Sequence, residues 1–482
     1  MKLLELSVLL LGSSRALASK LQKPIGAGVS PPTPPPPPPS SSLYSNNNAG
    51  EGDDAPPYRE SLVSLHKSLI DIESISFNEY DVGRFLVDYL TERGFVTELQ
   101  FLPSLNSTSI TVTNNDEKPR FNVLAWPGPA AGRGKRNHHY HDHPPRPKVL
   151  VTSHIDTVPP YIPYSVSDSS DTSLGLGSDS VIAGRGSVDA KASVAAQIVA
   201  VLSLLEDAEQ QVENPQDLML LYVVGEERNG DGMRFFSDSV NSNNTTTNKN
   251  SNRGDEEEQE GEELATPLSF DFSSVQAAIF GEPTEGKLAC GHKGFFGCEV
   301  RARGRAGHSG YPWLGQSATE ALMRGLVAVL DADLGSSADF GNTTINVGTL
   351  AGGAAPNVIA EAASAQIAGR VAIGPEDDGG RVVAERLVDV LRAVYPEDPQ
   401  AFETECRNGY GVVRCDCEVD GFETITVNYG TDVPNLKGNH TRYLYGPGSI
   451  LVAHGPDEAI KLRDLERAVE DYKKLILHAL KS

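Results

Sequence analysis

Apolar residues along the chain alternate between helical spacing and short continuous runs. Helical spacing predicts helices over residues 61–70, 79–93 and 190–210. Between these helices, apolar runs end at His154, Gly225 and Gly281. Near-continuous apolar strands separated by helices indicate a mostly parallel sheet that helices cover on both faces. The pattern therefore predicts an α/β fold.

The pattern changes after Gly294. Residues 295–305 alternate like a strand, residues 315–330 have helical spacing, and alternation returns within 343–373. This order of strands and helices predicts an inserted α+β domain, with parallel-sheet character resuming near Phe422. We place the first part of the main domain, the inserted domain and the second part of the main domain at residues 55–292, 293–415 and 416–482.

The N-terminal residues differ in composition from the rest of the chain. Lys2, the apolar stretch 3–11 and small residues at 16–18 match the three parts of a secretory signal peptide over residues 1–18. An ordinary amphipathic helix is the alternative. Residues 19–54 include the run PPTPPPPPPSSS, which is a stiff polyproline segment that buries nothing. We therefore expect this Pro/Ser-rich segment to be disordered.

Glycosylation acceptors agree with a secreted protein, although such triplets also arise by chance in cytosolic chains. Five asparagines have a Ser or Thr two positions later, with a residue other than Pro between: Asn106, Asn243, Asn244, Asn342 and Asn439. With the signal peptide, they lead us to expect a secreted, extracellular glycoprotein.

The charge of the chain excludes some classes of partner. Its 41 Lys and Arg residues face 65 Asp and Glu residues, for a formal net charge of −24. Nucleic-acid binding needs clustered basic residues, and crossing a bilayer needs an apolar run of about 18–20 residues, which is absent beyond the N-terminus. A His-rich stretch at 132–148 and an acidic stretch at 241–263 are predicted surface insertions. We therefore expect neither a nucleic-acid nor a membrane partner.

Five cysteines are too few for a disulfide framework in a chain of this length, and they fit no zinc-binding spacing. In an oxidising compartment one or two disulfides can form, which leaves at least one cysteine unpaired. The sequence does not decide the pairing among Cys290, Cys298, Cys406, Cys415 and Cys417.

Histidines and acids follow the ends of the predicted strands and begin the helices after them. In chain order they are His154, Asp156, Asp189, Glu226, Glu227, Glu282 and His454. Sites in parallel sheets lie beyond the carboxyl ends of the strands, so we expect these side chains to meet. Two histidines with several carboxylates offer the mixed nitrogen and oxygen ligands that suit zinc. A carboxylate shared between two ions is what a two-metal hydrolase requires.

Each of these clusters has a simpler interpretation when it is taken alone. Asp156 can fix the tautomer of a metal-bound His154, or the two can merely pair at a strand end. Asp189 can be an ordinary cap of the helix that follows. Glu226 and Glu227 repel each other at a buried strand end unless a cation lies nearby or one acts as a base.

The order of the motifs HID, GRGSVDAKA, GEE, GEPTE, GHSG, YGTD and AHGPDEAI resembles one zinc metallopeptidase family. That family includes glutamate carboxypeptidase, acetylornithine deacetylase, succinyl-diaminopimelate desuccinylase and aminoacylase. The resemblance runs from about residue 58 to the C-terminus. It implies two zinc ions per subunit, with Asp189 shared between them. The implied metal ligands are His154, Asp189, Glu227, Glu282 and His454.

The resemblance also implies roles for residues around the ligands. Asp156 would orient His154, and Glu226 would be the general base. The inserted domain would be a lid or dimerisation domain, with His308 of GHSG at the substrate oxyanion. Two looser matches are lid residues that would hold the substrate carboxylate, Asn357 and Arg370.

The implied activity is hydrolysis of the amide bond next to a free C-terminal carboxylate in small peptides, by metal-activated water. An N-acyl amino acid deacylase of acetylornithine deacetylase type would use the same catalytic atoms, and sequence does not resolve the pocket that separates the two. Glu282, where aminopeptidase-like relatives tend to carry Asp, favours carboxypeptidases and deacylases. An inactive binding protein would have lost Glu226 or a ligand, and none is lost. Secretion favours a carboxypeptidase, because biosynthetic deacetylation needs a cytosolic enzyme. The resemblance of the inserted domain to a dimerisation domain also implies a homodimer.

Overall fold

The structure is a computed structural model, and it describes most of the chain after residue 54. The described ranges are 55–103, 118–128, 145–167, 176–207, 212–246 and 269–481. The predicted signal peptide, the Pro/Ser-rich segment and most of both insertions lie outside these ranges. Within them, every helix is too short or too polar to span a bilayer.

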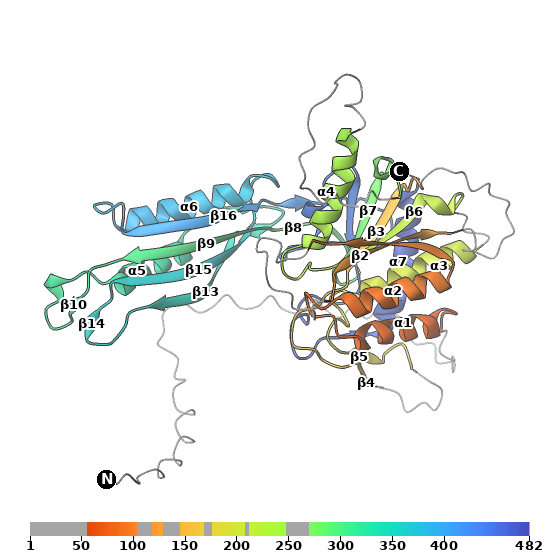
Figure 1. The fold of residues 1–482 in the computed structure, drawn as a ribbon, viewed down its shortest axis with the longest axis horizontal. Helices are drawn as coiled ribbons and strands as arrows, with labels where there is room; N and C mark the ends of the chain where they lie inside the picture. The colour runs from red at the N-terminus through yellow and green to blue at the C-terminus, as the bar shows by residue number, and fades with distance from the viewer. Residues whose placement is uncertain are drawn as a thin grey trace, which may run out of the picture. The chain divides into compact units, whose positions relative to one another are not determined.

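A nine-stranded sheet forms the main domain, and helices cover both of its faces (Figure 1). Strand β3 runs parallel to its neighbours β6 and β7, and β7 runs parallel to β19, whereas β1 and β2 form an antiparallel edge. The α/β class is therefore confirmed, and the predicted parallel pairing lies at the centre of the sheet. The strand order is β1 (Phe95–Phe101), β2 (Phe121–Pro127), β6 (Leu218–Val223), β3 (Val149–His154), β7 (Ala277–Gly281), β19 (Thr441–Tyr445), β8 (Leu288–His292) and β17 (Val413–Arg414), with β18 (Thr424–Val427) also paired to β8.

Side chains of the central strands divide between two hydrophobic cores. In β6, Leu220 and Tyr222 belong to one core, and Met219 and Leu221 belong to the other. Four helices contribute to the first core: α1 (Arg59–Asp71), α2 (Tyr80–Glu92), α3 (Lys191–Glu206) and α7 (Leu462–Ala479). Helix α4 (Asp231–Thr246) covers the opposite face. Burial on both faces explains why the central strands read as continuous apolar runs.

A small sheet joins two loops that matter for the site. It consists of β20 (Ala459–Lys461), β5 (Val181–Ala183) and β4 (Ser165–Ser167), in that order. Strand β5 precedes the loop that carries Asp189, and β20 follows the loop that carries His454. Because Ala459 pairs with Ala183, these two loops are held side by side.

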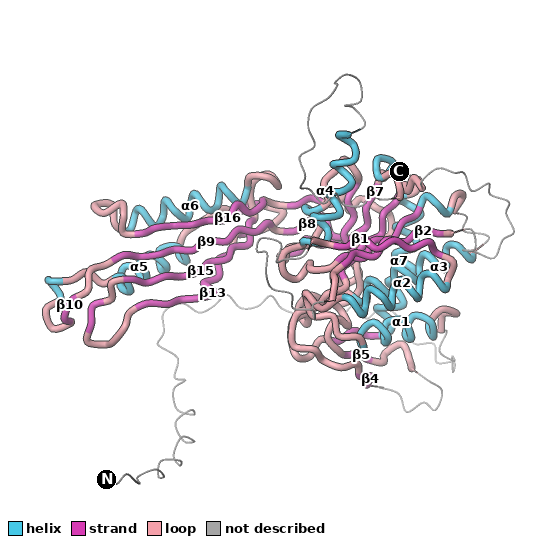
Figure 2. The backbone as a smooth tube through the Cα atoms, in the orientation of Figure 1, coloured by secondary structure: helices cyan, strands magenta, loops and turns pink. Residues whose placement is uncertain are grey.

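The inserted domain is an antiparallel sheet whose long strands run alongside one another (Figure 2). In β9, alternate residues such as Phe296 and Val300 are buried with α5 and α6 in a third core. The strand order is β13 (Thr344–Gly352), β15 (Ala362–Val371), β9 (Gly294–Arg303) and β16 (Phe402–Tyr410), and the helices are α5 (Ala318–Asp331) and α6 (Gly379–Val394). Two short strand pairs are β10 (Gly307–His308) with β14 (Val358–Ile359), and β11 (Ser336–Ser337) with β12 (Gly341–Asn342). The described residues also include the 3-10 helices η1 (Pro215–Asp217), η2 (Phe272–Ser274), η3 (Pro312–Leu314) and η4 (Val433–Asn435).

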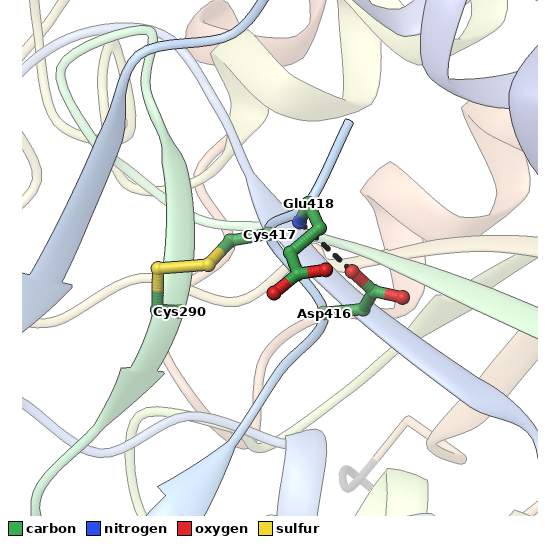
Figure 3. The surroundings of a disulfide bond; sticks show 4 residues. All are labelled: Cys290, Asp416, Cys417 and Glu418. Atoms are coloured by element: carbon green, nitrogen blue, oxygen red, sulfur yellow. Dashed lines mark hydrogen bonds between the residues drawn. A yellow bond between two sulfur atoms is a disulfide. The ribbon is translucent and has the colours of Figure 1, made fainter. Parts of the chain in front are cut away.

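Two disulfides give the cysteine pairing that the sequence left open. Cys290 of β8 pairs with Cys417, which follows β17 (Figure 3). Cys298 of β9 pairs with Cys406 of β16, and the two residues lie directly opposite each other in the antiparallel register. Cys415 is unpaired and partly buried. One disulfide therefore lies at the edge of the main sheet, and the other lies within the inserted sheet.

Candidate metal centre

The predicted metal ligands come together at one edge of the main sheet. His154 is the last residue of β3, and Glu282 directly follows β7. Strand β6 ends at Val223, and a turn after it carries Glu226 and Glu227. Since β3 pairs in register with β6 on one side and β7 on the other, both acidic segments flank His154.

His154 lies at the centre of the cluster and is 1% exposed. Its Nε2 is 3.0 Å from Oδ1 of Asp189 and 3.9 Å from Oε1 of Glu282. Its Nδ1 is 3.0 Å from the backbone carbonyl oxygen of Asp156 and 3.5 Å from the Asp156 carboxylate. A proton on Nδ1 that is donated to these oxygens leaves Nε2 able to ligate a metal. Asp156 thus lies where the sequence predicted, with its carbonyl oxygen as the nearer acceptor.

The Asp156 carboxylate also holds the turn that carries the adjacent glutamates. Its Oδ1 accepts the backbone N–H of Glu226 at 3.1 Å, and its Oδ2 accepts the backbone N–H of Glu227 at 3.3 Å. The hydroxyl of Ser76 donates to Oδ2 at 2.7 Å. Gly225, with a φ of 74°, provides the left-handed residue that begins this turn. One fully buried carboxylate therefore fixes the backbone of both glutamates.

Asp189 faces both histidines of the cluster. Its Oδ1 is 3.0 Å from Nε2 of His154, and its Oδ2 is 3.2 Å from Nε2 of His454. The N-cap of α3 is Ala190, and no side chain caps that helix. The alternative that Asp189 is an ordinary cap is therefore wrong. One oxygen of Asp189 therefore faces each of the two imidazoles.

His454 completes the second half of the cluster. Its Nε2 is 3.1 Å from Oε1 and 2.9 Å from Oε2 of Glu227. Its side chain is 51% exposed, and its backbone has a φ of 62°, in the left-handed region that non-glycine residues seldom adopt. The contacts therefore divide into two sets that share Asp189: His154 with Glu282, and His454 with Glu227.

This donor set fits metal ions that prefer nitrogen and oxygen ligands. Ligand atoms of His154, Glu226 and Glu282 lie within 4.8 Å of one another, as do those of His154, Asp189 and Glu227. Imidazoles and carboxylates in such numbers suit zinc and related divalent ions. Ligands of open α/β sheets bind beyond the carboxyl ends of the strands, which is where these groups lie.

The electrostatics of the cluster favour bound positive charge. Burial and the charge of Glu282 raise the pKa of Glu226 well above its usual range, and burial likewise raises the pKa of Glu282 and Glu227. Hydrogen bonds with Asp189 and Glu227 raise the pKa of His454 to about 10. Burial opposes ionisation of Asp189, but its hydrogen bonds to both histidines lower its pKa. A cation among these carboxylates would stabilise their charged forms.

Of the three predicted residues of the inserted domain, the structure brings two together and places the third, Arg370, elsewhere. His308 pairs with Val358 across β10 and β14, and the N–H of Ser309 donates to the carbonyl oxygen of Asn357 at 3.1 Å. Among the described residues, no hydrogen bond or ion pair links His308 or Asn357 to the candidate metal ligands. Arg370 lies near the other end of β15, eight residues after Ala362 at the start of that strand. At the usual rise of a strand, eight residues span about 26 Å between Ala362 and Arg370.

Arg370 lies near the cluster, at the base of the inserted domain. Its guanidinium is 5.6 Å from the centre of the Phe295 ring. Burial raises the pKa of Tyr410 to about 12, and the charges of both Arg370 and Glu226 act on that phenol. A Cβ on Gly430 would lie 2.4 Å from the Tyr410 hydroxyl and 3.4 Å from Nη1 of Arg370. Arg370 and the predicted base Glu226 therefore both act electrostatically on the same buried phenol.

Buried charged residues near the site escaped the sequence analysis. Asp432 of the YGTD motif is 5% exposed, burial raises its pKa to about 6, and its Oδ2 has no hydrogen-bond partner. Arg185 and Glu458 lie inside two of the motifs and form a buried ion pair. In the sequence, only their position within these motifs could have drawn attention to them, because neither residue follows the end of a predicted strand.

The predicted glycosylation acceptors are placed unevenly. Asn342 and Asn439 are exposed. Asn243 and Asn244 fall near the end of α4, and Asn106 lies outside the described residues.

Comparison with known proteins places this site in a family. A family model described as a peptidase dimerisation domain, of the M20 type, matches residues 290–399. A Peptidase M20 domain-containing protein of Sordaria macrospora is 52% identical over 89% of this chain and 87% of its own length. A protein of Aspergillus oryzae named a probable carboxypeptidase is 43% identical over 87% of each chain.

Solved structures share the fold at low identity. A tripeptidase from Staphylococcus aureus has a TM-score of 0.61 at 17% identity, over 88% of this chain and 99% of that one. An M20 family metallo-carboxypeptidase from Sulfolobus solfataricus has a TM-score of 0.56 at 14% identity, over 87% and 99%. A dinuclear metal binding peptidase from Bacillus subtilis has a TM-score of 0.52 at 13% identity, over 88% and 99%.

The fold, the clustered ligands and these relatives define a metal-dependent peptidase. The chain belongs to the M20 family, which confirms the resemblance seen in its motifs. Its inserted domain matches the dimerisation domain of that family.

Proposed function

We propose that this chain is a secreted, two-zinc carboxypeptidase that hydrolyses the amide bond before a free C-terminal carboxylate in small peptides. The observation that carries the proposal is the placement of Asp189, whose two carboxylate oxygens face the Nε2 atoms of two different histidines. A single carboxylate between two imidazoles suits a pair of ions better than one ion.

The ligands divide between the two proposed ions. His154 and Glu282 would hold one ion and His454 and Glu227 the other, with Asp189 common to both. Bound zinc would supply a water of lowered pKa and polarise the scissile carbonyl group. The Nδ1 contact of His154 keeps its Nε2 directed at the cluster.

Glu226 is the proposed general base. Its backbone is held by Asp156, and it shares no ion pair with either histidine in the described structure, which leaves its carboxylate available for proton transfer. Burial and the charge of Glu282 raise its pKa, and a raised pKa makes a carboxylate a better proton acceptor. Glu226 would take the proton of the attacking water and deliver it to the leaving amine.

Arg370 supports an activity on substrates with a free carboxylate. A guanidinium near the predicted base can bind a carboxylate through two parallel hydrogen bonds. Relatives named probable carboxypeptidases agree with this assignment. The product side of the scissile bond would then lie between Arg370 and Glu226.

His308 and Asn357 would reach the substrate through closure of the inserted domain or from a second subunit. The match to a dimerisation domain favours a homodimer. Helix α5 presents three exposed apolar residues at helical spacing, Met323, Val327 and Leu330, and β13 is an edge strand of the inserted sheet. An apolar helix face beside an unpaired strand edge is a surface that a second copy can cover.

Two disulfides support the proposed secretion. Cys290–Cys417 and Cys298–Cys406 are structural bonds of a kind that persists in oxidising compartments. They agree with the predicted signal peptide, and two predicted glycosylation acceptors are exposed, Asn342 and Asn439.

The test combines metal content with a substrate panel. Purified protein should contain two zinc ions per chain by elemental analysis, chelation should abolish hydrolysis, and zinc or cobalt should restore it. Dipeptides with a free C-terminal carboxylate should be cleaved, whereas amidated peptides should not. Preference for N-acyl amino acids over dipeptides would replace the carboxypeptidase assignment with a deacylase. Full activity in metal-free protein would refute the proposal.

A further inference from the structure

A buried ion pair joins the two loops that carry Asp189 and His454. Nη1 of Arg185 lies 2.5 Å from Oε2 of Glu458, and the two side chains are 2% and 1% exposed. Arg185 belongs to the loop before α3, and Glu458 directly precedes β20. We propose that this pair is a positioning device for the metal site formed by His454 and Asp189. The inference rests on the proposed two-metal function.

Glu458 holds the backbone of the bridging ligand. Its Oε1 accepts the N–H of Val188 at 3.0 Å and the N–H of Asp189 at 3.1 Å. Hydrogen bonds from backbone N–H groups to a buried carboxylate are stronger than neutral ones. The Glu458 carboxylate therefore fixes the main chain at Asp189, and both side-chain oxygens of Asp189 remain directed at the histidines.

Arg185 connects the same carboxylate to the second loop. Its Nη2 donates to the backbone carbonyl oxygen of His454 at 3.4 Å, and its Nε donates to that of Pro160 at 3.2 Å. The rigid fork of a guanidinium can make these bonds and the ion pair to Glu458 at once. A lysine at this position carries the charge but cannot reach all three acceptors.

His454 depends on such an anchor more than His154 does. His154 ends a strand that is paired on both sides, and its side chain is buried. His454 lies in a loop with its side chain half exposed and its backbone in the left-handed region. A non-glycine residue keeps that conformation only where its surroundings hold it. Asp189 serves both proposed sites but His454 serves only one, so loss of the Arg185–Glu458 pair should weaken the site at His454 more than the site at His154.

The experiment is a zinc titration of the metal-free full-length protein by calorimetry. Wild type should show two binding events. Arg185→Lys and, separately, Glu458→Asp should weaken one event, that of the His454 site, by about 10–100-fold, as loss of a supporting contact does, and should weaken the other event less. The control is Arg59→Lys at a partly buried ion pair, Arg59–Glu466, which joins α1 to α7. Its side chains are 12% and 10% exposed. This control should leave both events unchanged.

The outcomes separate this inference from the proposed function. Wild type that takes up fewer than two ions would refute the two-metal function itself. With two ions in wild type, an equal loss at both sites, or no loss at either, would overturn the role of the pair. Thermal unfolding of the metal-free variants shows whether each one folds, and Glu458→Asp carries the test if Arg185→Lys does not. Excess zinc should restore full occupancy of the weakened site, whereas a site lost through misfolding would stay empty.

Discussion

The turn held by Asp156 leads to a prediction that isolates its carboxylate. Asp156→Asn keeps the size of the side chain but replaces one acceptor oxygen with an NH2 group. In wild type the two oxygens accept the N–H groups of Glu226 and Glu227. Whichever way the amide lies, one of these N–H groups faces a donor and loses its partner. The hydroxyl of Ser76 can turn to accept from the amide, so that it does not add a second unpaired group.

The expected magnitude follows from this count of one orphaned donor. Leaving a buried N–H without a partner costs about 1–3 kcal/mol. For a large domain, each kcal/mol lowers Tm by roughly 2–4 °C, so a fall of roughly 2–12 °C is expected. Displacement of the turn should also weaken metal binding by about 10–100-fold, since Glu227 is one of the proposed ligands.

Thermal unfolding and zinc titration measure these two effects separately. The matched control is Ser76→Ala, which removes one hydrogen bond to Asp156 but keeps both bonds to the turn. It should lower Tm without changing metal affinity. Wild-type metal affinity in Asp156→Asn, or an equal loss of affinity in Ser76→Ala, would refute the reasoning.

Three further outcomes are expected. Glu226→Gln should lower kcat by roughly 10²–10⁴-fold with two zinc ions still bound, whereas Glu227→Gln should weaken zinc binding at the His454 site. The same metal content and the same residual activity in both variants would contradict these roles. His308→Ala should lower kcat by roughly 10²–10³-fold at unchanged metal content, and unchanged kcat would exclude it from the site. If a partner subunit supplies this histidine, mixed dimers of His308→Ala and Glu226→Gln should regain activity that neither has alone, and lid closure within one chain predicts no such recovery. Burial lowers the pKa of His440 to about 4. As the pH falls, the unfolded chain binds a proton at this histidine near pH 6.5, before the folded chain does, so stability should fall between about pH 6.5 and about pH 4. His440→Phe should flatten this slope of Tm against pH, and an identical slope would contradict the assignment.

Local patterns in the sequence were enough to predict the parallel centre of the main sheet and the segments that meet there. Continuous apolar runs are required of strands buried on both faces, and β3 and β6 are buried throughout. The ligand cluster followed because parallel strands bring their carboxyl ends to one edge. The antiparallel pairing of β1 with β2 left no such signal, because strand direction depends on a connection that composition does not encode.

Other features depend on contacts between segments far apart in the chain. The carboxylate of Asp156 is shared with the backbone of Glu226 and Glu227, some 70 residues later. The pair of Arg185 and Glu458 spans 273 residues. A single sequence shows that these charges exist but not that they are buried. The positions of His308 and Arg370 on the inserted domain depend on strand pairing, which the sequence does not give. Such contacts appear only in three dimensions.

The two disulfides bracket both crossings of the chain between the main sheet and the inserted sheet. Cys290 and Cys417 lie on the main side of these crossings, and Cys298 and Cys406 lie on the inserted side. A peptide bond cut anywhere between residues 299 and 405 therefore leaves two fragments that remain covalently joined twice. In a protease-rich medium, a nicked molecule would keep its inserted domain attached and migrate as one species until a reductant is added.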